Sequence, residues 1–286
     1  GWGLHLTTED IAKFGLFYIQ EGKWNGNQLL SSKWIKMATS KQVSNGSDPD
    51  SDWSQGYGFQ FWRSRFNTYR GDGAMGQFCL VIPEHNTIVA ITSGTDNMGG
   101  IMQIVWDELL PKMNSSEMIS NPKGIEILRK KSASLELEPI NGKMSKSLAK
   151  KFFNKKIKIA ENEESVEFIF FNNKKKEVEI KVNGKIETIP FGFGKYIKSE
   201  LDGHLPFTSS NHKIVPESSL RYLKNKKIAA SGAWISENEF QLRIYQYETP
   251  SRLDYIFNFK NGKLKWDCKK SNALGSGNQI ESIKSI

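Results

Sequence analysis

The chain has 286 residues, of which 38% are hydrophobic, 12% aromatic and 25% charged, and this composition excludes an intrinsically disordered or collagen-like protein. No apolar run approaches the roughly 18 residues of a membrane-spanning helix, so we expect a soluble globular protein of one large domain or two ordinary ones. The net charge of +9 is compatible with nucleic-acid binding, but no recognition motif accompanies the basic residues. We therefore expect no nucleic-acid partner.

The first 111 residues have helical patterns at both ends and strand patterns between them. A helix begins at Thr8 with acidic residues in its first turn, and its apolar spacing continues to Gly22. The order of the elements favours an α+β domain in which helices cover an antiparallel sheet. The later elements are a helix from Ser32, strands at residues 57–62, 78–82 and 87–92, and a helix at residues 101–110 that stops at Pro111.

A linker is expected after this domain. Residues 112–122 contain few large apolar residues and end in Asn-Pro, which disfavours helix and suits a connection between domains. We place the linker, with one short helix, at residues 112–139 and the second domain at residues 140–286. Asn183-Gly184 and Asn261-Gly262 in that domain predict two-residue hairpins, because both residue types tolerate the positive φ of a type I′ turn.

The second domain is expected to be all-β and lysine-rich. Its short antiparallel strands suggest a barrel or a sandwich, and we favour a closed barrel because closure removes open sheet edges. Residues 1–114 hold 9 Lys and Arg against 11 Asp and Glu, whereas the remainder holds 31 against 20. We interpret the excess as a solvated surface. The strand patterns cover residues 166–171, 177–182, 185–190, 228–235, 239–247, 253–259 and 263–267.

A glycine-rich segment at residues 71–76, Gly-Asp-Gly-Ala-Met-Gly, matches the GxGxxG fingerprint of dinucleotide-binding proteins. The context excludes that function, because the fingerprint needs a helix after it and residues 77–83 have the pattern of a buried strand that ends at a turn. Glycines before a strand can instead bring a backbone N–H close to a ligand, where it stabilises an oxyanion. The alternative is a glycine-rich bulge with no function.

Four segments in this order, residues 1–15, 24–26, 56–62 and 71–83, resemble the C-terminal half of serine hydrolases related to β-lactamases. Among these hydrolases they are most similar to the class C type and, within it, to the branch of 6-aminohexanoate-dimer hydrolases and esterases. The resemblance covers residues 1–111. It implies part of a β-lactamase-like catalytic domain and acyl transfer on a small amide or ester substrate through a covalent serine ester.

The resemblance also implies two motifs, SxxK and YxN, which carry the nucleophile and the proton carriers. SxxK occurs at residues 120–123, 147–150 and 210–213, about as often as chance predicts, and none of these opens an apolar helix; YxN does not occur. In the family both motifs precede the segment that residues 1–15 resemble. We therefore expect a fragment that begins partway through the catalytic domain and is inactive alone. Its partner is the missing N-terminal segment, and its exposed sheet edges favour self-association or domain swapping.

The third family motif, a cationic residue followed by Ser or Thr and then Gly, aligns with Gly71-Asp72-Gly73. The resemblance makes the backbone N–H of Asp72 the candidate oxyanion-hole donor, with Gly71 and Gly73 beside it. Because Gly71 replaces the cationic residue and Asp72 the hydroxyl, β-lactamase activity is not expected, and the Asp72 carboxylate would disfavour anionic substrates. The residues expected to line the substrate pocket are Tyr57, Tyr69, Met75, Gly76 and Gln77, with Trp53 and Arg70 near them.

Neither a metal nor a cofactor is expected. The histidines, at positions 5, 85, 204 and 212, show no paired spacing for a metal. Cys79 and Cys268 are too few and too far apart for a disulfide scaffold or a four-ligand zinc site. The first residues carry no export signal, which leaves the compartment open.

The second half resembles the lipocalin-like domain that follows some of these hydrolases, through residues 190–194, 230–234 and 247–250. This resemblance supplies the alternative to an enzyme fragment: a non-catalytic binding or accessory module whose barrel holds an apolar ligand or a cell-envelope component. Small barrels are more often filled by their own side chains.

Overall fold

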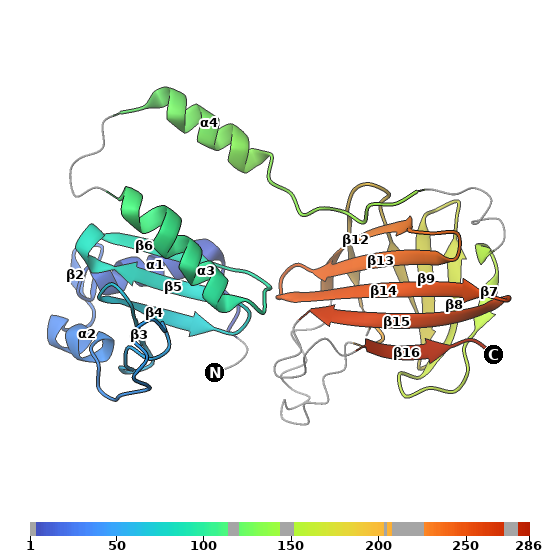
Figure 1. The fold of residues 1–286 in the computed structure, drawn as a ribbon, viewed down its shortest axis with the longest axis horizontal. Coiled ribbons are helices and arrows are strands. Elements are labelled where there is room, and N and C mark those ends of the chain that lie inside the picture. The colour runs from blue at the N-terminus through green and yellow to red at the C-terminus, as the bar shows by residue number, and fades with distance from the viewer. Residues whose placement is uncertain (1–3, 114–119, 144–151, 203–204, 208–225, 272–279) are drawn as a thin grey trace. The chain divides into compact units, whose positions relative to one another are not determined.

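The computed structural model describes residues 4–113, 120–143, 152–202, 205–207, 226–271 and 280–286 (Figure 1). The chain divides into two compact units, Gly1–Ile127 and Leu128–Ile286. The division falls inside helix α4 (Pro122–Ala133), in the segment for which the sequence predicts a linker. Among the helices of the described ranges, none combines the length and the apolar content that crossing a membrane requires.

The first two helices begin where a hydroxyl caps the backbone. α1 (Thr8–Ile19) follows Thr7, whose side chain accepts a hydrogen bond from the Asp10 N–H at 3.2 Å. α2 (Ser32–Thr39) follows Ser31, whose hydroxyl accepts from the Trp34 N–H at 3.2 Å. Such caps satisfy donors that a helix start leaves unpaired. Both predicted helices are confirmed, with Thr7 rather than Thr8 as the cap of α1.

A four-stranded antiparallel sheet forms the centre of the first unit, in the order β3-β4-β5-β6. α1 lies behind this sheet and α3 (Met98–Ile104) in front of it (Figure 1). α1 approaches closely because Gly15 faces the sheet: a Cβ at Gly15 would lie 2.7 Å from Cγ2 of Ile88. The strands are β3 (Trp62–Ser64), β4 (Thr68–Gly73), β5 (Gln77–Ile82) and β6 (Thr87–Ile91).

Two hydrophobic clusters hold the helices to the two faces. Tyr18 and Ile35 of the helices pack with Phe61, Tyr69 and Val81 on one face. On the other face, the cluster joins the sheet to α3 and to the π-helical turn Val105–Leu109 that continues it. That second cluster consists of Phe78, Leu80, Ile82, Met102, Val105 and Trp106.

The strand predicted at residues 57–62 is not formed as one element. Gln60 has φ of 65°, and this left-handed conformation interrupts an extended chain. Tyr57 therefore makes only isolated bridges, to Val43 and Trp62, and β3 begins at Trp62. A short hairpin precedes these elements and joins α1 to α2 through Asn25 and Gly26, both with positive φ; its strands are β1 (Lys23–Trp24) and β2 (Asn27–Gln28).

The second unit contains two antiparallel sheets, and both predicted hairpins are confirmed. Asn183 and Gly184 have φ of 49° and 77°, and Asn261 and Gly262 have φ of 52° and 77°. The first sheet, in the order β10-β9-β8-β7, consists of β7 (Lys156–Lys158), β8 (Val166–Asn172), β9 (Glu177–Val182) and β10 (Lys185–Pro190). The second sheet, in sequence order, consists of β11 (Ile197–Leu201), β12 (Lys226–Trp234), β13 (Glu239–Gln246), β14 (Ser251–Lys260), β15 (Lys263–Ser271) and β16 (Ile280–Lys284).

The predicted fold class, an α+β domain followed by a closed barrel, is wrong. Among the described residues, antiparallel strand is more abundant than helix, and the strands form four separate sheets, none of which closes on itself. In the second unit the strands of the two sheets cross (Figure 1), as in orthogonal sheet packing. Within the described part of this unit, the sheets are connected by two single bridges, Gly192 with Ser231 and Ile159 with Ser285.

Local chemistry explains why pairing between the two sheets stops after the single bridge at Gly192. β10 ends at Pro190, which has no N–H to continue a ladder. Gly192 then lies so close to the Lys195 carbonyl oxygen that a Cβ would be 2.2 Å from it, so the backbone turns away from β12 after one bridge. The space between the sheets is filled by buried aromatic side chains, which include Phe171, Phe240, Phe257 and Trp266.

Candidate functional site

The glycine-rich end of β4 extends beyond its neighbour β3. The β3–β4 ladder ends at the pair Trp62 and Arg70, whereas the β4–β5 ladder continues to the pair Gly73 and Gln77. Within the described ranges, residues 71–73 therefore have a strand partner on the β5 side only. Gly71 adds no side chain there, and the nearest atom to a Cβ built on it is 3.6 Å away. Backbone groups of this overhang are placed to contact a ligand.

A tight turn fixes the far end of the overhang. Met75 and Gly76 have φ of 67° and 83°. A Cβ on Gly76 would lie 2.3 Å from Oγ of Ser93, so this position requires glycine for both conformation and space. The Ser93 hydroxyl donates to the Met75 carbonyl at 2.6 Å, and the Gln77 side-chain amide donates to the Ser93 carbonyl. These bonds tie the turn to the segment that follows β6.

A buried ion pair supports the overhang from one face of the sheet. Nε and Nη2 of Arg70 donate to the same carboxylate oxygen of Asp72 at 3.0 and 2.8 Å, and the Trp53 indole N–H donates to that oxygen at 3.1 Å. The Arg70 side chain is completely buried, and that of Asp72 is 8% exposed. Residues 70 and 72 share a face because side chains alternate along a strand.

The rest of the Arg70 guanidinium is also satisfied. Nη1 donates to the Asp52 carbonyl at 2.9 Å and to the Ser64 hydroxyl, and the guanidinium carbon lies 4.7 Å from the Trp53 ring centre. Burial raises the pKa of the Asp72 carboxyl, while Arg70 and Trp53 oppose that shift. Because Arg70 neutralises Asp72, the expected repulsion of anionic substrates is weakened.

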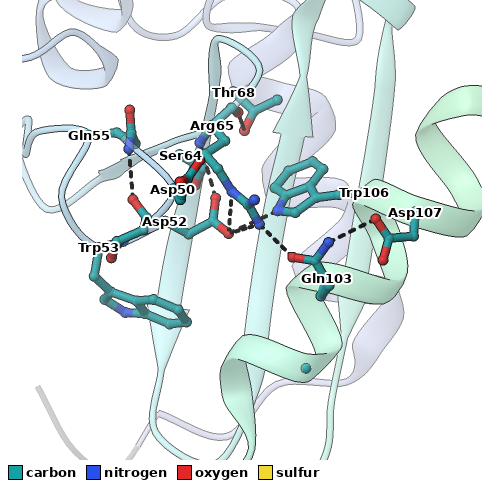
Figure 2. Close-up of polar contacts among 12 residues, drawn as sticks. Asp50, Asp52, Trp53, Gln55, Ser64, Arg65, Thr68, Gln103, Trp106 and Asp107 are labelled. Carbon is teal, nitrogen blue, oxygen red and sulfur yellow. Dashed lines mark hydrogen bonds and ion pairs between the residues drawn. The ribbon is translucent and has the colours of Figure 1, made fainter. Parts of the chain in front are cut away.

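A second buried carboxylate, Asp52, holds the loop before β3 against the Val105–Leu109 turn that follows α3 (Figure 2). It accepts hydrogen bonds from the Arg65 backbone N–H at 3.0 Å, from Nη2 of Arg65 at 3.0 Å and from the Trp106 indole at 2.9 Å. Arg65 also donates to Gln103 at 2.9 Å, and Gln103 donates to Asp107 at 2.8 Å. Since the Asp52 side chain is 4% exposed, it acts as an anchor between elements.

The other predicted pocket residues have mainly structural contacts. Tyr69 is 5% exposed and packs edge-on against Phe61 with ring centres 5.8 Å apart, which leaves its side chain inaccessible to a substrate. Met75 is 7% exposed. Tyr57 is half-buried and contacts the Trp62 ring at 5.0 Å. The structure thus brings Gly71, Asp72, Gly73 and Trp53 together, with Gly76 and Gln77 at the adjoining turn.

The candidate nucleophile motifs do not join this group. Ser120 is exposed and precedes α4, which has no buried residue, and Asn121 caps that helix by accepting from the Gly124 N–H at 2.9 Å. The SxxK motifs at residues 147–150 and 210–213, and the histidines at 204 and 212, lie outside the described residues. In the part of the chain that the structure describes, no group of three His, Cys, Asp or Glu side chains could hold a metal.

The comparisons with known proteins identify no relative. No family model, no curated protein and no solved structure matches the chain. The interpretation of the site therefore rests on its own residues and on the resemblance of its motifs.

Sequence reasoning missed the two carboxylate clusters that organise the site. The Arg70-Gly71-Asp72 spacing was a usable signal, because residues two apart on a strand lie on one face and opposite charges attract. No comparable signal exists for Asp52 and Trp106, which are 54 residues apart. Asp52 and Trp53 are neighbours in sequence, yet their side chains belong to different clusters, that of Asp52 with Arg65 and that of Trp53 with Asp72.

Proposed function

We propose that the first unit supplies the oxyanion-binding strand of a serine hydrolase related to the β-lactamases, which acts on a small amide or ester. The observation that carries the proposal is the overhang of β4, where Gly71, Asp72 and Gly73 have a strand partner on one side only among the described residues. Backbone N–H groups at such an edge can stabilise the negative charge that develops on a carbonyl oxygen during acyl transfer.

The surrounding contacts suit this role because they fix the strand. Arg70 and Asp72 are buried on one face of β4, and the turn after Gly73 is held by Ser93 and Gln77. A donor fixed before the reaction does not need to reorganise in the transition state, which is the source of its catalytic effect. The same contacts keep the Asp72 carboxylate turned to Arg70, so the backbone of residue 72 is the group offered to a substrate.

The nucleophile and its proton carriers are assigned to residues outside this sequence. SxxK at residues 120–123 precedes an exposed helix, and the sequence contains no YxN. We expect the chain alone to give no burst with p-nitrophenyl acetate and no labelling by a fluorophosphonate. The product of the complete coding region is expected to give the burst and to be labelled by the fluorophosphonate.

The decisive comparison is between two variants of that complete product. Asp72→Pro removes the carboxylate and the backbone N–H, whereas Asp72→Asn removes the charge and keeps the N–H. We expect kcat of the proline variant to be about 100-fold to 1,000-fold below that of the asparagine variant, with circular dichroism showing that both are folded. Equal kcat values, or a complete product that no fluorophosphonate labels, would reject the proposal.

The alternative, a second unit that binds an apolar ligand, gains no support from the hollow beside Phe153, Phe191 and Trp234. That hollow has a volume of about 10 Å³, which accommodates roughly one water molecule.

A further inference from the structure

Trp53 is the residue through which the loop before β3 reaches the glycine-rich overhang of β4. Its indole N–H donates to Oδ2 of Asp72 at 3.1 Å, and the same oxygen accepts from Nε and Nη2 of Arg70. The Trp53 ring also lies over the Arg70 guanidinium, whose carbon is 4.7 Å from the ring centre. A half-buried side chain from outside the strand therefore contacts both members of the ion pair.

This contact supplies something that the ion pair lacks. Arg70 and Asp72 belong to the same strand, so a bond between their side chains does not by itself fix that strand relative to its surroundings. The β3–β4 ladder has already ended at Arg70. Among the described residues, Trp53 provides the side-chain hydrogen bond that reaches Asp72 from outside β4. The indole thus ties the overhang to a second element of the unit.

The loop that carries Trp53 is itself fixed by internal hydrogen bonds. The side-chain amide of Gln55 donates to three carbonyl oxygens of this loop, at 2.8 to 3.2 Å; they belong to Asp48, Pro49 and Ser51. The Ser51 hydroxyl accepts from the backbone N–H of Trp53 at 3.2 Å. These bonds hold the backbone on both sides of Trp53.

The indole ring is held from the side of α3. Trp53 packs against the hydrophobic cluster that includes Phe78 and Met102. A Cβ on Gly99, in the first turn of α3, would lie 4.0 Å from Cζ3 of Trp53, so the ring lies beside that turn. Because loop and ring are both fixed, the indole N–H is directed at Asp72 before any substrate is bound.

We propose that Trp53 is a positioning residue for the oxyanion-binding strand, and that it holds the backbone N–H of Asp72 in place through the Asp72 carboxylate. This inference rests on the proposed hydrolase function. A catalytic group that is misplaced by about 1 Å can lower a rate about 100-fold. Loss of one of the three donors to Asp72 is a smaller disturbance, so we expect an effect of about tenfold. Because Trp53 acts through Asp72, the effect should fall on kcat and not on KM.

The position of the strand can be measured in the chain itself by NMR relaxation of the backbone amides. Trp53→Phe keeps an aromatic ring near Arg70 and removes the N–H, and the order parameter of the Asp72 amide is expected to fall from about 0.85 toward about 0.6. Trp34→Phe is the matched control, because Trp34 is 44% exposed on α2 and packs on Phe59; it should leave this order parameter unchanged. No change in Trp53→Phe, or an equal fall in both variants, overturns the proposal.

The effect on catalysis is measured in the product of the complete coding region. Trp53→Phe is expected to lower kcat about tenfold and to change KM by less than about twofold, whereas Trp34→Phe changes neither. An unchanged kcat, or an effect confined to KM, overturns the role of Trp53. A complete product that no fluorophosphonate labels instead rejects the hydrolase function, so the two failures are distinguishable, and the order parameter still tests how Trp53 holds Asp72.

Discussion

Replacing Asp52 by asparagine tests whether buried charge holds the loop before β3 in place. The change keeps the size of the side chain but turns an amide NH2 toward N–H donors of Arg65 and Trp106. Breaking a buried ion pair costs about 3–5 kcal/mol. Because Arg65 is 19% exposed and keeps its bond to Gln103, we expect a loss of unfolding free energy at the lower end of this range, about 3 kcal/mol.

Differential scanning calorimetry of the full chain measures this effect, because the two units have separate cores and are expected to unfold in separate transitions. Asp52→Asn should lower the Tm of the first unit by on the order of 10 °C and leave that of the second unit unchanged. Glu108→Gln is the matched control, since Glu108 pairs with Lys112 at 2.6 Å while both side chains are more than two-thirds exposed; its expected shift is below about 2 °C. Equal shifts for the two variants would refute the argument that burial sets the energy.

Three further outcomes follow from the first unit and the cysteines. Burial raises the pKa of the Cys79 thiol to about 11, and Cys268 is also buried, so Ellman's reagent at pH 8 should react with neither until urea unfolds the chain; rapid reaction of the native protein would contradict this. The folded state holds the Cys79 proton up to about pH 11, whereas the unfolded state loses it near pH 9. The contribution of this proton to the free energy of unfolding is therefore fully present below pH 9 and is lost as the pH rises to 11. The loss is on the order of 3 kcal/mol, and urea titrations of wild type and Cys79→Ala across this window should show a smaller decline in the variant. Gly15→Ala places a methyl group 2.7 Å from Ile88 and 2.9 Å from Cys79 and is expected to cost about 1–3 kcal/mol, whereas Gly99→Ala, 4.0 Å from its nearest neighbour, serves as the control and should not destabilise.

Local signals predicted the helices and the hairpins of this protein. α1 and α2 follow from hydroxyl caps and apolar spacing, and Asn183-Gly184 and Asn261-Gly262 specify their turns by residue type alone. In each case the interactions that decide the structure lie within a few residues of each other. A sequence pattern can therefore represent them completely.

Features that depend on distant contacts were not predictable in the same way. The predicted strand at residues 57–62 is broken by the left-handed conformation of Gln60. This conformation was not predictable, because the residue is not a glycine. Closure of the second unit depends on whether strand pairing extends beyond the single bridges at Gly192 and at Ile159, which the strand patterns do not encode. In the site, alternation along β4 could have indicated the Arg70–Asp72 pair, but the contact of Asp52 with Trp106 requires the tertiary fold.

Helix α4 has a practical consequence for how the protein is dissected. None of its side chains is buried, so opening it sacrifices no core packing and requires little free energy. It also carries Lys123, Arg129, Lys130 and Lys131, which are cleavage sites for trypsin. Limited digestion at this helix should therefore cut the chain near the division between the two units while the core of each unit remains intact.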